Sequence, residues 1–249
     1  RTRQMGEQQM SAIRAGSATD IGQVRSKNQD AVLAGERLFV VADGFGGAGE
    51  VASCIALQTI AEVFGATPTP GGLAEACSAA NLAVLQRAEG DPDLTGMGTT
   101  VAAIGVVRTE STEQLALANV GDSRVYLLRQ GELSPMTEDH SVVADLVRAG
   151  EITKKEARVH EERSILTRAL GVGRVVRPDT SQLTPRDGDR FLLCTDGLGN
   201  ELVDDEIASI LGSTPDPARA AEQLVRAASE HGGADNTSVI VVDVVGATA

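Results

Sequence analysis

Aromatic residues are scarce in this sequence of 249 residues, with four Phe, one Tyr and no Trp. A hydrophobic core must therefore be built from the aliphatic side chains of Val, Leu, Ile and Ala. Residues of hydrophobic type make up 42% of the chain, which is enough for a real core. This length fits one large domain or two small ones.

Positive charge is also in short supply, because 22 Lys and Arg stand against 35 Asp and Glu and give a formal net charge of −13. The phosphates of nucleic acids need a basic surface, so this balance argues against a nucleic-acid-binding protein. It equally disfavours contact with anionic membranes. An acidic protein can still act on phosphate esters if metal ions reverse the local field.

Long apolar runs are missing as well. No segment approaches the roughly 18 to 20 apolar residues of a membrane span, and no secretory signal is visible. The three cysteines, Cys54, Cys77 and Cys194, have no metal-ligand spacing, and each lies in an apolar segment. We expect them to be small buried hydrophobes in a reducing compartment, and the chain to be a cytoplasmic monomer without membrane contact.

The most informative stretch that is present is LFVVADGFGG, residues 38–47. Its continuous apolar run predicts a strand buried on both faces, and the glycines after it permit close backbone approach. Asp43 stands at the end of this strand. A carboxylate there is costly unless something positive meets it.

Three further aspartates occupy comparable places, and the sequence places each beside another apolar run: Asp122 after 115–120, Asp196 after 190–195, and Asp235 before 238–245. A single Asp-Gly pair is more typical of an ordinary turn. Four acidic residues at the ends of four core strands indicate one cluster instead. Their mutual repulsion would raise their pKa values unless cations hold them together.

The candidate metal ligands are all oxygen atoms, which suits Mg²⁺ or Mn²⁺ and, less specifically, Ca²⁺. A zinc site would need His or Cys ligands. The histidines His140, His160 and His231 are scattered along the chain, and there is no cysteine pair. The sequence therefore favours a hard divalent cation.

Periodicity predicts blocks of helices and strands rather than a regular repeat. We expect strands at 11–17, 31–34, 38–43, 96–107, 115–120, 123–129, 190–195 and 237–245, and helices at 50–64, 73–87, from 141, 204–211 and 218–230. This order favours a layered α+β fold. We expect one domain over 11–249 after a loose polar leader at 1–10. The charged segment 150–163 is expected to be an exposed flap or, more simply, a solvated loop.

Six short motifs together resemble the metal-dependent PP2C-like serine/threonine protein phosphatases, with the bacterial branch most similar. In chain order they are Arg25-x-x-Asn28-Gln29-Asp30, Ala42-Asp43-Gly44-Phe45-Gly46-Gly47, Gly98-Thr99-Thr100, Asn119-Val120-Gly121-Asp122-Ser123-Arg124, Thr195-Asp196-Gly197 and Asp235-Asn236-Thr237-Ser238. The resemblance covers about residues 12–245. It implies a four-layer α-β-β-α sandwich, two mainly antiparallel sheets flanked by helices, with a metal site at one edge.

The resemblance also implies a set of metal ligands. Asp43 resembles the carboxylate that bridges two Mn²⁺ or Mg²⁺ ions, and Gly44 would offer its carbonyl to one of them. Asp196 and Asp235 would bind the other ion. Asp122 resembles the aspartate that, with Asp196, holds a third metal in bacterial members.

The same resemblance assigns Arg25 to gripping the substrate phosphate and Asp30 to orienting the attacking water. Segment 150–163 corresponds to a variable flap. The implied substrates are phosphoserine and phosphothreonine proteins, the targets of serine/threonine kinases. Two metals lower the pKa of a bridging water, which attacks phosphorus directly.

Some residues depart from the family pattern. Phe45 stands where some relatives carry a histidine proposed as general acid, so water is expected to protonate the leaving alkoxide. The loop 46–50 is shorter than usual and lacks the customary histidine. His140 is either a proton donor or a structural hydrogen-bonding residue, and the second interpretation is favoured.

Two rival functions remain open to the sequence. A catalytically silent phosphoprotein sensor with the same fold is one, but such proteins usually lose a core carboxylate and here all are present. A metal-dependent nuclease is the other, and it conflicts with the net charge of −13. Because the sequence starts at Arg1, we expect a catalytic domain taken from a longer protein.

Overall fold

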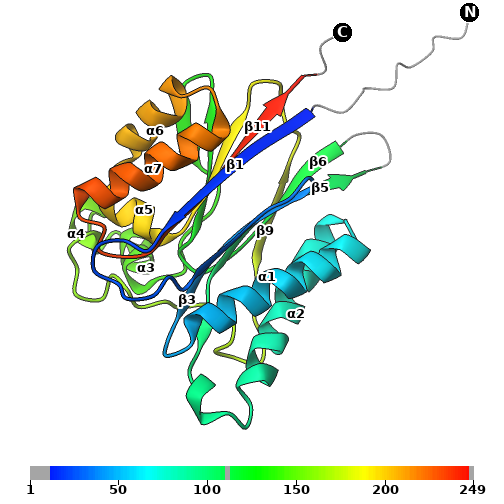
Figure 1. Cartoon of the computed structure of the whole chain (residues 1–249), viewed down its shortest axis with the longest axis vertical. Helices are drawn as coiled ribbons and strands as arrows, with labels where there is room; N and C mark the ends of the chain where they lie inside the picture. Colours follow the sequence, from blue (N-terminus) through cyan, green and yellow to red (C-terminus); the bar gives the residue numbers. More distant parts are fainter. Residues whose placement is uncertain (1–11, 110–112, 247–249) are drawn as a thin grey trace, which may run out of the picture.

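The computed structural model describes residues 12–109 and 113–246, so the predicted leader at 1–10 lies outside the described residues. Two sheets pack face to face, and helices cover the outer face of each (Figure 1). This confirms the predicted α-β-β-α sandwich. No helix of the described part of the chain is long and apolar enough to cross a bilayer.

Both sheets are antiparallel throughout. The first has the order β1 (Ala12–Asp20), β11 (Thr237–Val245), β10 (Arg190–Cys194), β7 (Arg124–Arg129) and β8 (Glu132–Pro135). The second has the order β2 (Asp30–Ala34), β3 (Leu38–Phe45), β5 (Val101–Arg108), β6 (Glu113–Val120) and β9 (Asp179–Leu183), with β4 (Gly98–Thr99) paired to β3.

The strand β3 has a buried side chain on both of its faces, as its unbroken apolar run predicts. Phe39 and Val41 pack between the sheets against residues such as Phe191 and Leu193 of β10. Val40 faces the other way, into the cluster beneath the first two helices. Two-sided burial of this kind requires apolar residues at successive positions rather than at alternate ones.

Two helical layers close the sandwich, and Figure 1 shows them on opposite sides. The second sheet is covered by α1 (Gly49–Ala66) and α2 (Pro70–Ala88). The first sheet is covered by α5 (Asp196–Glu201), α6 (Asp204–Ser213) and α7 (Pro217–His231). The remaining helical segments are η1 (Pro92–Leu94), α3 (Val142–Ala149) and α4 (Lys154–Ala157).

The start of α2 differs from the sequence prediction, which left residues 70–72 in the connection. Pro70 is instead the first helical residue, where its missing N–H has no helical partner to lose. The Thr69 hydroxyl caps the helix by accepting from the backbone N–H of Gly72 at 2.9 Å. The two glycines are therefore tolerated because the helix is capped and packed.

Other elements were missed or misplaced by the periodicity. The sequence analysis predicted neither β9 nor α5, and it treated 150–163 as lacking a helix although α4 lies within it. A capping box between Thr153 and Glu156 starts α4. The expectation that all three cysteines are buried is wrong for Cys54, which is exposed, whereas Cys77 and Cys194 are buried.

Candidate functional site

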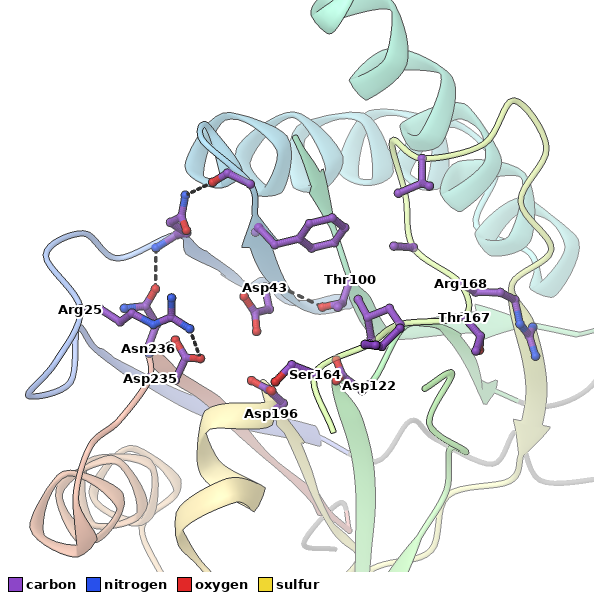
Figure 2. Close-up of a pocket in the computed structure, with 18 residues that line it drawn as sticks. Arg25, Asp43, Thr100, Asp122, Ser164, Thr167, Arg168, Asp196, Asp235 and Asn236 are labelled. Carbon is purple, nitrogen blue, oxygen red and sulfur yellow. Dashed lines mark hydrogen bonds and ion pairs between the residues drawn. The ribbon is translucent and has the colours of Figure 1, made fainter. Parts of the chain in front are cut away.

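A cavity of about 590 Å³ lies where the two sheets meet at one edge of the sandwich. Its polar side includes Arg25, Asp43, Asp122, Asp196 and Asp235, and Figure 2 shows the four aspartates around one space. The structure therefore brings together residues that the sequence predicted from four separate strand ends. No group of three or more His, Cys, Asp or Glu side chains among the described residues is gathered tightly enough to hold a metal ion as placed.

Each of these aspartates reaches the cavity from a different element. Asp43 lies within β3, and Asp122 lies in the turn after β6. Asp196 is the first residue of α5, directly after β10, and Asp235 stands just before β11. The second sheet thus contributes Asp43, the first sheet positions Asp196 and Asp235, and Asp122 lies in the connection from β6 of the second sheet to β7 of the first.

The backbone of Asp43 is fixed by two threonines of the neighbouring strands. Its N–H donates to the Thr100 hydroxyl at 3.0 Å, and its carbonyl accepts from the Thr100 N–H at 2.9 Å. The Thr99 hydroxyl donates to the same carbonyl at 2.9 Å. These bonds occupy the main chain of Asp43 and leave its carboxylate to the cavity.

Gly44 is placed where no side chain fits. A Cβ there would collide with the backbone carbonyl of Gly49 and would lie 2.6 Å from the carbonyl oxygen of Gln29. Its N–H donates to the Gln29 carbonyl at 3.1 Å. The close approach of three backbone segments therefore explains the glycine after Asp43.

Burial and mutual repulsion disfavour the charged forms of these carboxyls. The pKa of Asp43 is raised well above its ordinary value by burial first and then by the negative charges of Asp196 and Asp30. Burial followed by the charge of Asp196 likewise raises the pKa of Asp122 well above its usual range. The pKa of Asp196 is raised by burial and by Asp235.

Two buried carboxylate oxygens of the described residues are left without partners, one on Asp196, which lines the cavity, and one on Asp30, which is not among the lining residues. Oδ1 of Asp30 and Oδ1 of Asp196 are buried and have no hydrogen-bond partner in the described part of the chain. A buried oxygen that accepts nothing is costly unless a cation or water completes it. The unpaired Asp196 oxygen and the all-oxygen donor set therefore fit a hard divalent cation.

Asp30 lies directly opposite Asp43 in the register of β2 and β3. Its Oδ2 accepts from the Thr195 hydroxyl at 2.9 Å. Burial raises the pKa of Asp30 to about 7, and the hydrogen bonds from Ser238 and Thr195 offset only part of that rise. This carboxyl can therefore change its protonation near neutral pH.

Arg25 lies at the rim of the cavity in the segment between β1 and β2. Its Nη2 is 2.6 Å from Oδ2 of Asp235, and its side chain is 52% exposed. The guanidinium is thus anchored at one carboxylate and open to solvent beside it. Figure 2 shows this pair at the end of the cavity that also holds Asn236.

Asn236 holds the backbone at this end of the site through hydrogen bonds. The sequence placed Asn236 in a motif but indicated no role for it. Its Oδ1 accepts from the Gln29 N–H, and its Nδ2 donates to the carbonyls of Ile21 and Lys27, each at 2.9 Å. The buried amide therefore holds the segment that carries Arg25. The only signal in the sequence was its position next to Asp235.

His140 is buried beside the site, with 1% of its surface exposed. Its Nδ1 accepts from the Gly121 N–H, and its Nε2 lies against Oδ2 of Asp179, each at 3.0 Å. Both ring nitrogens are thus engaged, and His140 is not among the residues that line the cavity. The geometry favours the structural interpretation of this residue over a proton donor.

The sequence analysis did not single out the far wall of the cavity. This wall consists of residues 164–169 and Val172, in the chain between α4 and β9. The wall carries two exposed apolar side chains, Ile165 and Val172. Sequence periodicity could not reveal it, because the segment has no regular secondary structure.

Comparisons with known proteins agree with this geometry. A family model described as "Protein phosphatase 2C" matches residues 22–234. The chain is 42% identical over 240 residues to the serine/threonine protein phosphatase PstP of Mycobacterium tuberculosis, covering 94% of this chain and 45% of PstP. It is 37% identical to the serine/threonine phosphatase stp of Listeria welshimeri, covering 90% of this chain and 93% of that protein. The chain therefore spans less than half the length of PstP.

Solved structures show the same fold. The serine-threonine phosphatase MsPP of Mycobacterium smegmatis, in complex with cacodylate, superposes with a TM-score of 0.87 at 43% identity, covering 94% of this chain and 99% of that one. The catalytic domain of PstP in complex with two manganese ions superposes with a TM-score of 0.85 at 41% identity, covering 94% and 98% of the two chains.

Proposed function

This chain belongs to the bacterial branch of the metal-dependent protein phosphatase 2C family, and we propose that it hydrolyses phosphoserine and phosphothreonine in proteins. The observation that carries the proposal is the meeting of four aspartates from four elements in one cavity, with Arg25 at its rim. The substrates are proteins phosphorylated by serine/threonine kinases.

The proposed ligands of the two core ions are the Asp43 carboxylate, the Gly44 carbonyl, and the carboxylates of Asp196 and Asp235. Asp43 is suited to a position shared by both ions, because it lies close enough to Asp196, Asp30 and Asp122 for their charges to raise its pKa, in addition to the larger effect of burial. Asp122, next to Asp196, is the proposed ligand of a third ion. Mn²⁺ or Mg²⁺ suits this oxygen set, and when bound the ions lower the pKa of water and offset phosphate charge.

Arg25 is proposed to bind the phosphate. Its planar guanidinium presents several N–H donors, so it can keep its contact with Asp235 while another edge donates to phosphate oxygens. The exposed position of the side chain gives it room to do so. The attraction would also strengthen as charge builds on the equatorial oxygens.

Asp30 is proposed to orient the attacking water. Its unpartnered Oδ1 can accept a hydrogen bond, while Oδ2 is held by Thr195. Burial raises the pKa of this carboxyl to about 7 without metal, and a bound cation would favour its charged form, which accepts hydrogen bonds from water. Phe45 has no proton to give, so water is the proposed source of the proton for the leaving alkoxide.

The proposal includes a monomer that acts in the cytoplasm without contact with nucleic acid or membranes. The net charge of −13 supports the absence of contact with nucleic acid and anionic membranes. The cysteines described by the structure are all free, which agrees with a reducing compartment. The rival function, a silent phosphoprotein sensor, is less well supported, because none of the carboxylates that catalysis needs is missing.

The direct test is hydrolysis of phosphoserine and phosphothreonine peptides and of p-nitrophenyl phosphate, with Mn²⁺, with Mg²⁺ and with a chelator. We expect phosphate release that requires the metal and returns when the metal is restored. Binding of the phosphopeptides without release of phosphate would favour the silent sensor. Absence of both hydrolysis and binding would contradict the proposed function.

A further inference from the structure

The cavity is larger than a phosphorylated side chain needs. Its volume of about 590 Å³ falls within the range of about 300 to 1,000 Å³ in which pockets enclose drug-sized ligands. Figure 2 shows Arg25 and Asp235 at one end, and Thr167 and Arg168 at the other. A phosphoryl group held by the carboxylate end leaves the space before the far wall for another part of the substrate.

The far wall is held in place by its main chain. Backbone hydrogen bonds of 2.8 to 3.1 Å fix two of its positions and the adjoining residue Leu170. The Val142 N–H donates to the Ile165 carbonyl, the Thr167 N–H donates to the His140 carbonyl, and Leu170 is bonded to Thr99 in both directions. The wall is therefore anchored both to the start of α3 and to β4. A surface fixed in this way can recognise a ligand without first being ordered.

The one charged residue of the wall is held on the side away from the carboxylates. Arg168 is the charged residue of this wall, and its Nη1 donates to Oδ1 of Asp179 at 2.5 Å and to the Arg177 carbonyl at 3.1 Å. Asp179 is held in turn by His140. In Figure 2 the Arg168 side chain points away from the aspartates. Its guanidinium is thus held at one edge, through Nη1, on the side away from the carboxylates.

What the wall does offer is apolar surface. Ile165 is 48% exposed and Val172 is 68% exposed, and both line the cavity. Phe45, which follows the Asp43-Gly44 pair, contributes a third apolar side chain to the same cavity. Its ring lies against Gly98, where a Cβ would collide with it. Single exposed apolar residues need no explanation, but two exposed ones and the half-buried Phe45 around one cavity indicate a contact surface.

We infer that Ile165, Val172 and Phe45 form an apolar subsite that receives a bulky apolar side chain next to the phosphorylated residue of the substrate protein. This inference rests on the proposed phosphatase function and adds a sequence preference to it. The subsite is continuous with the carboxylate end, so one peptide can fill both. An acidic neighbour would have to compete with Asp179 for Arg168, and a basic neighbour would be repelled by the Arg168 charge.

The test compares phosphothreonine peptides that differ at one neighbouring position. Leucine, glycine, glutamate or lysine is placed in turn at each of the two positions on either side of the phosphothreonine. We expect the leucine peptide to be used best at one of these positions, with kcat/KM about tenfold above the glycine peptide, a typical effect for one apolar group in a pocket. The glutamate and lysine peptides should show no such gain.

Substitutions then locate the preference. Ile165→Ser and Val172→Ser should each reduce the ratio of leucine to glycine peptide, and the double variant should bring it close to one. Using the ratio within each variant removes any general change in activity. Val175→Ser is the matched control, because Val175 is 83% exposed and does not line the cavity, so its ratio should equal that of the unmodified protein.

Three results would overturn the inference. Equal use of leucine and glycine peptides at every position would remove the preference itself. A preference that survives the double variant would place it elsewhere on the protein. A change in sedimentation of the serine variants, without a change in the ratio, would assign the patch to contact between copies of this chain. Failure of the proposed function is distinguishable, because the unmodified protein would then hydrolyse none of the peptides.

Discussion

Asp30 and Asp43 face each other across β2 and β3, as a directly opposed pair in the antiparallel register. Side chains at such positions point to the same face of the sheet and come close together. Burial is the main cause that raises the pKa of both carboxyls, and nearby negative charges add to it: Asp196 and Asp30 for Asp43, and Asp196 and Asp235 for Asp30. Two buried carboxyls this close are stable together only if one of them holds a proton or a cation lies beside them.

The first prediction concerns stability without metal. The folded state holds the Asp30 proton up to about pH 7, whereas the unfolded chain releases it near pH 3.8. Between these values the folded state binds more protons, so stability should fall as the pH rises. We expect the melting temperature in chelator to be lower at pH 7.5 than at pH 5.

Saturating Mn²⁺ should reverse this trend, because a cation favours the charged carboxylates and binds only the folded protein. At about one hundred times its dissociation constant a ligand stabilises by about 2.7 kcal/mol. Asp30→Asn should flatten the dependence in chelator. A melting temperature that rises with pH in chelator would show that the buried carboxyls are charged in the metal-free protein.

The second prediction concerns the proposed metal ligands. Replacing Asp43, Asp196 or Asp235 with Asn should lower kcat/KM for p-nitrophenyl phosphate by about 10³-fold, because a lost metal contribution is worth several kcal/mol. Asp93→Asn, a change at an exposed aspartate of η1, is the matched control and should retain full activity. Undiminished hydrolysis by the triple variant would refute the assigned site.

The third prediction concerns Arg25. Removing its charge-assisted hydrogen bonds to phosphate should reduce kcat/KM on phosphothreonine peptides by about 10- to 100-fold in Arg25→Ala. Arg25→Lys should recover only part of this loss, because lysine lacks the planar fork. Lys27→Ala serves as control, since Lys27 pairs with Glu50 outside the cavity lining. Equal losses in both alanine variants would point to a general effect of this segment.

The fourth prediction concerns Asp122. If it holds a third ion with Asp196, Asp122→Ala should shift the Mn²⁺ activation curve to higher concentration, with a smaller loss at saturation than Asp43→Asn causes. Removing a buried carboxylate also relieves repulsion with Asp196. The metal-free variant should therefore melt at a higher temperature than the unmodified protein. Activation curves that superimpose would exclude the third site.

The layered α+β fold could be predicted from the sequence because its signals are local and strong, whereas the four-layer sandwich came from the family resemblance. The apolar run 38–43 predicts a strand buried on both faces, and the aspartates beside apolar runs predict where those strands begin or end. The motif order supplied the topology through a family resemblance. The sequence predicted that four aspartates form one cluster, and all four line the same cavity, namely Asp43, Asp122, Asp196 and Asp235.

Elements with weak local signals could not be predicted. The strand β9 is mostly exposed and polar and is specified by pairing with β6 rather than by its own pattern. The single-turn helices α4 and α5 are too short to show a period. Asn236 holds residues that are more than 200 positions away in the chain, and the wall at 164–169 is fixed by backbone hydrogen bonds to residues 140 and 142. Local sequence patterns do not reveal such contacts.

The division of ligands between the sheets has a consequence for assembly. Asp43 belongs to the second sheet, Asp196 and Asp235 adjoin strands of the first sheet, and Asp122 lies in the connection between the two sheets. A cation bound by both Asp43 and Asp196 would link the second sheet, which carries Asp43, to the first sheet, whose strand β10 leads into Asp196. High-affinity metal binding would then require both halves to be folded. A partly folded chain would therefore be unable to dephosphorylate other proteins.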